Sequence, residues 1–254
     1  MSDFISRLLV ERPGPTWLAP TREAGLARWR ASEKPTRRTE AWKYTGLQRL
    51  EREFSVPEPE PATAPQSGLP EFGGPRVVFV DGFLQGDIGQ LDLPAGVRLI
   101  RFANADPEQA ARIAARIGSA VASGRHLFAS LNEATLADGL YLEVAAGARL
   151  EQPLHIVHAT SEREPAFSVN QRLLVVLEDN AEASVIEHFT GSSPAAFTNG
   201  ITELLLGAGA RLRHCRLHLE QGGAMHIGGV HARLERDSLL DGFHIALGSD
   251  LKRI

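Results

Sequence analysis

Histidine and cysteine are the side chains of this sequence that could hold a metal ion or carry sulfur. It contains nine histidines and one cysteine, and seven of the histidines lie close together in one stretch: His155, His158, His188, His214, His218, His226 and His231. His214, Cys215 and His218 are the only candidates that we name for soft-metal ligation, with sulfur transfer as a further role for Cys215. Their spacing matches no established metal motif, so we assign no catalytic, cofactor-binding or metal residue.

The strand pattern around Cys215 favours a structural role for it. Alternation places His214, Arg216 and His218 on one face of a strand and Cys215 on the other. In a 28-residue register Cys215 stacks on Phe243, so we expect a buried, inert thiol. The histidines are expected to point outward as ordinary polar surface or interface residues. A sulfur carrier or metal ligand stays open as the alternative.

The sequence lacks the common motifs of catalysis. It has no G-x-x-x-x-G-K-[ST] loop, no G-x-G-x-x-G, no G-x-S-x-G elbow and no H-E-x-x-H, and we therefore predict that the chain is not itself a P-loop ATPase. An iron–sulfur cluster usually takes about four thiolate-type ligands. With one cysteine, the chain is expected to hold no cofactor stably by itself, and an iron–sulfur cluster or iron could only be shared with a partner.

A second group of residues combines cations with scarce aromatic rings: Arg37, Arg38, Trp42, Lys43 and Tyr44. Exposed aromatics beside cations would suit a nucleic-acid-binding module. However, Tyr44, Leu47, Leu50 and Phe54 recur at spacings that predict one apolar face of a helix. We therefore expect a helix packed inside its own chain, with Trp42 stacked on a nearby arginine.

The N-terminal quarter is expected to be helical and to end in a linker. Residues 1–54 form a predicted helical region, with an apolar stripe over residues 4–9 and a second helix capped by Thr21. Residues 55–75 carry six prolines and read as an extended linker. Residues 76–139 form a predicted α/β lead-in, with a hairpin at Asp81-Gly82 and a helix capped by Asp106.

From residue 140 to residue 254 the sequence predicts repeating β structure. Four segments align on turn residues at intervals of 33, 29 and 28 residues: Ala148, Ala181, Ala210 and Ser238. Each unit holds two candidate strands around a Gly/Asn/Asp turn, which is typical of the coils of a parallel β-helix. The last strand pattern has no polar cap, so either a partner covers this edge or, as we expect, the protein is longer and continues after Ile254.

Amino-acid composition and net charge restrict the class of protein to which the chain can belong. Hydrophobic residues make up 43% and charged residues 23%, which is typical of globular chains. The net charge of -4 disfavours wholesale nucleic-acid binding. No run approaches the ~18 apolar residues of a membrane span, and the N-terminus lacks a signal-peptide pattern. We therefore predict a cytoplasmic protein with no nucleic-acid or membrane partner.

Two ordered strings give the chain a family resemblance. The first, R-x-E-x-W-K-Y-T, consists of Arg38, Glu40, Trp42, Lys43, Tyr44 and Thr45. The second spans residues 131–154 and consists of Leu131, Asn132, Ala134, Asp138, Gly139, Gly147, Pro153 and Leu154. Together they resemble the SufB/SufD family of the SUF iron–sulfur assembly system, and the first string resembles its SufD branch.

The resemblance implies a fold, a role and partners. It implies a mainly β protein, with a right-handed parallel β-helix core and an N-terminal helical region. It also implies a non-catalytic scaffold that supports cluster assembly and iron acquisition. Its partners would be a SufB-like subunit and a SufC-like ATPase, both bound through regions after Ile254. The alternatives are a carbohydrate-active β-helix protein, and a nucleic-acid-binding module that uses the cluster from Arg37 to Lys43.

Overall fold

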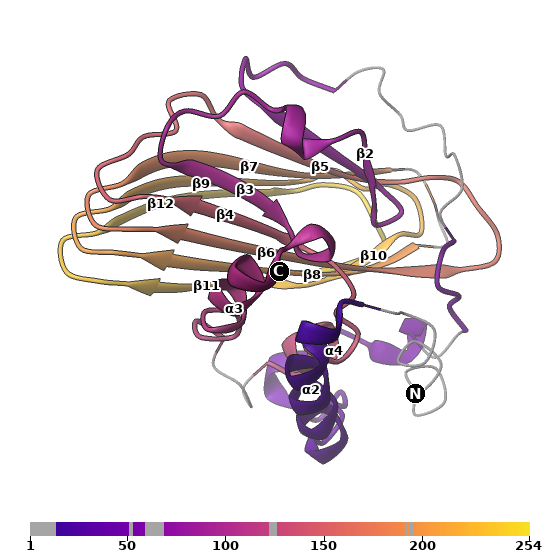
Figure 1. The fold of residues 1–254 in the computed structure, drawn as a ribbon. Helices are drawn as coiled ribbons and strands as arrows, with labels where there is room; N and C mark the ends of the chain where they lie inside the picture. Colours follow the sequence, from indigo (N-terminus) through magenta and orange to yellow (C-terminus); the bar gives the residue numbers. More distant parts are fainter. Residues whose placement is uncertain (1–13, 51–52, 59–68, 122–125, 192, 194–195) are drawn as a thin grey trace.

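Two β-sheets pack against each other to form the body of the protein (Figure 1). The computed structural model describes the chain except for residues 1–13, 51–52, 59–68, 122–125, 192 and 194–195. The first sheet has the strand order β12-β9-β7-β5-β1-β2, and the second has the order β13-β10-β8-β6-β4-β3, with β11 also paired to β8. Apolar side chains from both sheets meet in one core, including Leu142, Val175, Ile156 and Val185.

The strands follow one another as four coils of a parallel β-solenoid, which confirms the predicted fold class. Each coil places one strand or strand pair in each sheet. The coils are β4 (Leu140–Val144) with β5 (Leu154–Thr160), β6 (Phe167–Leu177) with β7 (Glu182–Gly191), β8 (Ala196–Leu206) with β9 (Arg211–His218), and β10 (Met225–Ile227) and β11 (Gly229–Leu234) with β12 (Leu239–Ala246). Strand β13 (Leu251–Arg253) then continues the second sheet beside β10.

The predicted repeat register is confirmed. The residues that follow the aligned turn positions pair across the coils: Arg149 with Glu182, Glu182 with Arg211, and Arg211 with Leu239. The residue just before each aligned turn position has a positive φ angle. These residues are Gly147, Asn180, Gly209 and Asp237, with φ angles of 69°, 58°, 67° and 60°. Gly, Asn and Asp tolerate this left-handed conformation best, so the turn chemistry sets where each coil folds back.

The lead-in strands extend both sheets at the start of the solenoid. β1 (Arg76–Val80) pairs in parallel with β5, and β3 (Val97–Arg101) pairs antiparallel with β4. β2 (Phe83–Gln85) forms the predicted hairpin with β1 through Asp81 and Gly82, whose φ angles are 52° and 87°. Both angles lie in the left-handed region that two-residue hairpin turns require.

Helices lie along the side of the second sheet (Figure 1). The α-helices are α2 (Ala19–Ala31), α3 (Pro107–Ala114) and α4 (Leu127–Ala134), and the short 3-10 turns are η1 (Thr16–Leu18), η2 (Glu40–Trp42), η3 (Leu47–Leu50), η4 (Ile88–Gln90) and η5 (Phe102–Asn104). Asp106 caps α3 through a capping box, as predicted. Thr21 does not cap α2, because the helix already begins at Ala19 with a proline in its first turn. The apolar stripe predicted for residues 4–9 lies outside the described residues, as do residues 59–68 of the predicted linker.

The predicted single helix through Tyr44 and Phe54 is wrong in part. Leu47, Leu50 and Phe54 are buried, as expected, but Tyr44 is 91% exposed. The segment forms two separate 3-10 turns, η2 and η3, so residues three apart still share a face while Tyr44 turns away from it. Trp42 packs 5.5 Å from the Phe128 ring, between ring centroids.

Trp42 also carries the predicted cation–π contact, and its partner is Arg253. The Arg253 guanidinium lies 4.0 Å from the centre of the Trp42 ring. Because Arg253 belongs to β13, this contact ties the N-terminal segment to the last described strand of the second sheet.

Truncating Trp42 should therefore weaken the fold far more than truncating Tyr44. We expect Trp42→Ala to lower the free energy of unfolding by about 2 kcal/mol, because a half-buried ring and a cation–π contact are lost. Tyr44→Ala should stay within about 0.5 kcal/mol of the wild type. Urea unfolding followed by circular dichroism measures both, and equal losses for the two variants would contradict this packing.

Candidate functional site

The interior of the solenoid changes from apolar to polar along successive coils. In the first coil β5 turns Leu154 and Ile156 inward, where both are fully buried in the core. Through the strand pairings, the same two positions are occupied two coils later by His214 and Arg216 on β9. His214 is 1% and Arg216 is 0% exposed, so charged and polar side chains replace the hydrocarbon core here.

This placement reverses the inward and outward faces that the sequence predicted for β9. His214, Arg216 and His218 are buried inside, on the same face as Leu212, which packs in the main apolar core. Cys215 lies on the outer face and is only partly buried. The prediction was wrong because it assigned polar side chains to the outside. Polar partners on neighbouring coils allow these side chains to be buried on the inner face.

Cys215 is therefore separated from the two histidines that the sequence grouped with it. It pairs with Phe243 in register, as predicted, and with Ile186 on the other side. Burial raises the pKa of its thiol, and the nearby carboxylate of Asp241 raises it further. A thiol with a raised pKa is a weak nucleophile and a poor metal ligand at neutral pH.

Glu187 is the centre of the first buried polar cluster. Its Oε1 atom lies 2.8 Å from His214 Nε2 and 3.1 Å from Arg216 Nε, and Thr202 Oγ1 donates to the carboxylate at 2.8 and 2.9 Å. Burial alone would raise the pKa of Glu187, but the charge of Arg216 and the hydrogen bond from His214 outweigh it. They hold the pKa well below its usual range, so the carboxylate stays ionised.

Arg216 depends on Glu187 for its charge balance. Its guanidinium lies 4.8 Å from the centre of the Phe189 ring. Its Nη1 and Nη2 atoms have no hydrogen-bond partner among the described residues. Glu187 is the only carboxylate that forms an ion pair with it in the described chain. This is a buried structural ion pair rather than an arrangement for acid–base chemistry.

A second buried cluster lies beside the first and combines His218, Glu220 and His226. Glu220 Oε1 lies 2.6 Å from His226 Nδ1, and Glu220 Oε2 lies 3.1 Å from the Nζ atom of Lys252. The ring centroids of His218 and His226 are 4.5 Å apart. Burial raises the pKa of Glu220, but His226 and Lys252 outweigh it and hold the pKa well below its usual range. Of these residues, the sequence prediction named only His218.

Stacked rings lead from the start of the solenoid to the second cluster. Phe79, His158, Phe189 and His218 occupy successive coils at paired positions, with centroids 5.4, 5.0 and 4.6 Å apart. Burial lowers the pKa of His158 to about 4 and that of His218 to about 2. Both imidazoles are therefore neutral at pH 7.

Replacing His158 should make the fold less sensitive to acid. A histidine with a lowered folded-state pKa takes up a proton on unfolding at pH values between about 4 and 6.5, so stability falls as the pH falls through this window by about 1.4 kcal/mol per unit. His158→Phe keeps the ring stack and removes this proton. We expect the stability lost between pH 7 and pH 5 to be smaller by about 2 kcal/mol, measured by urea unfolding. An unchanged pH dependence would contradict it.

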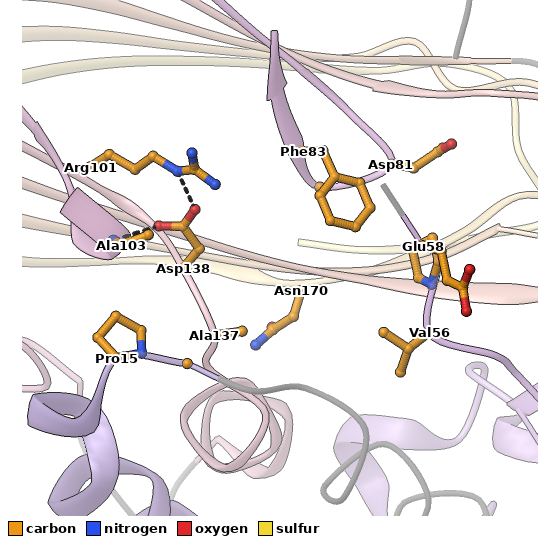
Figure 2. A pocket seen from close by; sticks show the side chains of 13 residues that line it. Pro15, Val56, Glu58, Asp81, Phe83, Arg101, Ala103, Ala137, Asp138 and Asn170 are labelled. Carbon is orange, nitrogen blue, oxygen red and sulfur yellow. Dashed lines mark hydrogen bonds and ion pairs between the residues drawn. The ribbon is translucent and has the colours of Figure 1, made fainter. Parts of the chain in front are cut away.

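A surface cavity of about 730 Å³ lies where the lead-in meets the solenoid (Figure 2). Asp138 on its wall pairs with Arg101 and accepts from the backbone N–H of Ala103. Asp81 accepts from Ser161 and pairs with Arg163. Since both carboxylates are held by contacts within the wall, neither is set up as a general acid or base.

The family-motif residues lie on the surface around Trp42. Trp42 and Thr45 are partly buried, and the rest are exposed: Arg38, Glu40, Lys43 and Tyr44. The motif therefore acts through Trp42 as a packing element. No helix among the described residues is long and apolar enough to cross a membrane.

Comparison with known proteins matches both halves of the chain. The family model described as the SufBD protein N-terminal region matches residues 6–156, and the model for the SUF system FeS cluster assembly SufBD core domain matches residues 158–254. An iron–sulfur cluster assembly SufBD family protein of Synechocystis is 27% identical over 233 residues, covering 86% of this chain and 51% of the relative.

Two further relatives show the same coverage. The chloroplastic protein ABCI7 of Arabidopsis thaliana is 28% identical over 233 residues, covering 86% of this chain and 48% of the relative. The iron–sulfur cluster assembly protein SufD of Escherichia coli is 27% identical over 224 residues, covering 86% and 50%. The chain spans about half the length of these curated relatives. With both family regions matched in order along a parallel β-solenoid, the chain belongs to the SufB/SufD family.

Proposed function

We propose that the chain belongs to a SufD-type, non-catalytic scaffold subunit that supports SUF iron–sulfur cluster assembly and iron acquisition. The observation that carries this proposal is the order of the two family regions along one continuous solenoid. The iron–sulfur cluster and its iron are cargo of the assembly. Cys215 points outward with a raised thiol pKa, so a cluster would draw its thiolate ligands largely from a partner.

A scaffold role rather than an enzymatic one is supported by how the polar groups are used. The carboxylates of Asp81 and Asp138 on the cavity wall and that of Glu187 are held in ion pairs and hydrogen bonds within the fold. The sequence has no P-loop, so ATP hydrolysis in the complex would come from another subunit. We infer that this subunit is a SufC-like ATPase and that a SufB-like subunit pairs with the scaffold. The lone cysteine fits a reducing compartment such as the cytoplasm.

Co-purification tests the complex directly. The affinity-tagged full-length gene product is expressed with the SufB-like and SufC-like proteins of the same organism, with an unrelated tagged β-solenoid as the control. We expect both partners to be retained by the tagged chain and neither by the control. Retention of neither partner would overturn the scaffold proposal.

The nucleic-acid alternative keeps one observation in its favour, which is the exposure of Tyr44 next to Lys43. Binding through this surface would weaken steeply with salt and would fall in Tyr44→Ala, since stacking on a base contributes about 1–3 kcal/mol. We expect no binding of single-stranded DNA or RNA even at low salt. Salt-dependent binding that Tyr44→Ala abolishes would favour the alternative.

A further inference from the structure

The second polar cluster of the solenoid interior contains potential metal-ligand atoms, and some of them have no hydrogen-bond partner among the described residues. His218, Glu220 and His226 each offer a ligand atom, and these atoms lie within 4.8 Å of one another. The three side chains are 0%, 3% and 1% exposed. Two imidazoles and one carboxylate are thus gathered away from water, from the end of β9, the loop that follows it, and β10.

His218 is the sharpest anomaly. Neither Nδ1 nor Nε2 of its ring has a hydrogen-bond partner in the described chain, and Nε2 of His226 has none either. A buried polar atom without a partner costs about 1–3 kcal/mol, and such atoms are rare in folded proteins. The stack on Phe189 holds the His218 ring in place but satisfies neither nitrogen. A fold that keeps this histidine here leaves its nitrogens available to a ligand.

We propose that His218, Glu220 and His226 form a binding site for one divalent first-row transition-metal ion. Imidazole nitrogen with carboxylate oxygen suits Fe²⁺, Zn²⁺ and Co²⁺, and two histidines with one carboxylate are the donor set of non-haem Fe²⁺ sites. Three protein ligands leave coordination positions open for exchange. Selection of Fe²⁺ as the ion carried in the cell rests on the proposed function, whereas the site itself does not.

The pKa shifts of His218 and Glu220 are compatible with metal binding. A metal ligand must be a neutral imidazole or an ionised carboxylate. Burial lowers the pKa of His218 to about 2, and the net effect of its surroundings holds the pKa of Glu220 below its usual range.

Lys252 competes with the metal for Glu220. Its Nζ atom lies 3.1 Å from Glu220 Oε2, but it also donates to the backbone carbonyl of His218 at 2.6 Å and to that of Leu247. The lysine is thus anchored by the backbone and keeps one positive charge beside the site. Removing that charge should strengthen metal binding, because like charges repel most where water is excluded.

The loop between β9 and β10 separates the proposed site from solvent. Gln221 and Gly222 in this loop are exposed, while Glu220 beside them is buried. Gly222 has a φ of 64°, a conformation that lets the loop turn sharply above the site. The ion would therefore pass one short loop rather than the length of the solenoid.

Titration of the full-length protein with Co²⁺, after treatment with a chelator, tests the site through the visible absorption of the bound ion. We expect one ion per chain, with Fe²⁺ competing under anaerobic conditions and Mg²⁺ not competing, since Mg²⁺ prefers oxygen ligands. His218→Phe preserves the ring stack and should weaken Co²⁺ binding at least about tenfold, as should Glu220→Gln. Lys252→Met should strengthen it.

His158→Phe is the matched control, because it makes the same change two positions earlier along the alternating ring stack, with Phe189 between it and His218. Its Co²⁺ affinity should equal that of the wild type. Wild-type affinity in His218→Phe, equal losses in the two variants, or displacement by Mg²⁺ would each overturn the site. Metal binding is measured without partners, so its failure is distinct from a failure of co-purification.

Discussion

Replacing Glu187 by leucine is expected to lower the free energy of unfolding by about 3–5 kcal/mol, the largest effect that we predict for a single side chain. The substitution leaves Arg216 with a buried positive charge, no ion-pair partner among the described residues, and two terminal nitrogens that already lack hydrogen bonds. It also removes the acceptor of His214 and Thr202. Urea unfolding at pH 7 measures the loss.

A double-mutant cycle separates the ion pair from the packing. In Glu187→Leu/Arg216→Met no charge remains buried at this point, and we expect most of the lost stability to return, because a hydrophobic replacement of a buried pair is often neutral or better. Glu182 on the same strand is the surface control. Its ion pair with Arg149 at 3.2 Å is partly exposed, so Glu182→Gln should change stability by less than about 1 kcal/mol.

The cycle also has a clear contradictory outcome. If Glu187→Leu is no more harmful than Glu182→Gln, the interior is wet or the Arg216 charge is balanced in another way. If the double variant is as unstable as Glu187→Leu alone, the loss comes from packing rather than from an unpaired charge. Either result would refute the conclusion that Glu187 balances a buried charge on Arg216.

Asn132→Asp is expected to be the second most harmful change, at about 3 kcal/mol or more. Asn132 is fully buried in α4, and its Nδ2 atom donates to the backbone carbonyls of Gln171 and Asn199 at 2.9 and 3.0 Å and to the side chain of Asn170. It therefore clamps the helix to β6 and β8. An aspartate turns these contacts into pairs of facing acceptors.

Gln109→Glu is the control for Asn132→Asp, because it makes the same change from amide to carboxylate at a partly exposed position. The Gln109 side chain accepts from the backbone N–H of Asp106 in the capping box of α3, and glutamate accepts equally well. We expect less than about 0.5 kcal/mol of change in thermal or urea unfolding. A loss in Asn132→Asp no larger than in this control would show that the clamp contributes little.

The solenoid was predictable because its turns have strict local requirements. Gly147, Asn180, Gly209 and Asp237 supply the left-handed residue of each turn, and these types stand out in the sequence at near-regular intervals. The hairpin at Asp81 and the capped helix α3 followed from equally local rules. Such local signals can be recognised without knowing which coils lie next to each other in the fold.

The polar interior was not predictable from the same patterns. The alternation of side chains along β9 correctly predicts which residues share a face. The polar side chains on one face led to the wrong prediction that this face is exposed to solvent. The deciding partners, Glu187 and Glu220, lie 27 residues before His214 and six residues before His226 respectively, and only the folded coils bring them together. Tyr44 was misplaced for a related reason, since a spacing of three fits a 3-10 turn as well as an α-helix.

A gene deletion tests the proposed role in iron–sulfur cluster assembly in the cell. The gene is deleted from its own organism, and the activity of a labile iron–sulfur dehydratase is measured per amount of that enzyme, with and without the gene restored. We predict that the dehydratase activity falls on deletion under iron limitation and returns with the wild-type gene. Adding dehydratase protein that lacks its cluster should not restore the activity. The deletion strain should contain no family member other than the SufB-like protein. Full dehydratase activity in this strain under iron limitation would contradict a role in iron–sulfur cluster assembly.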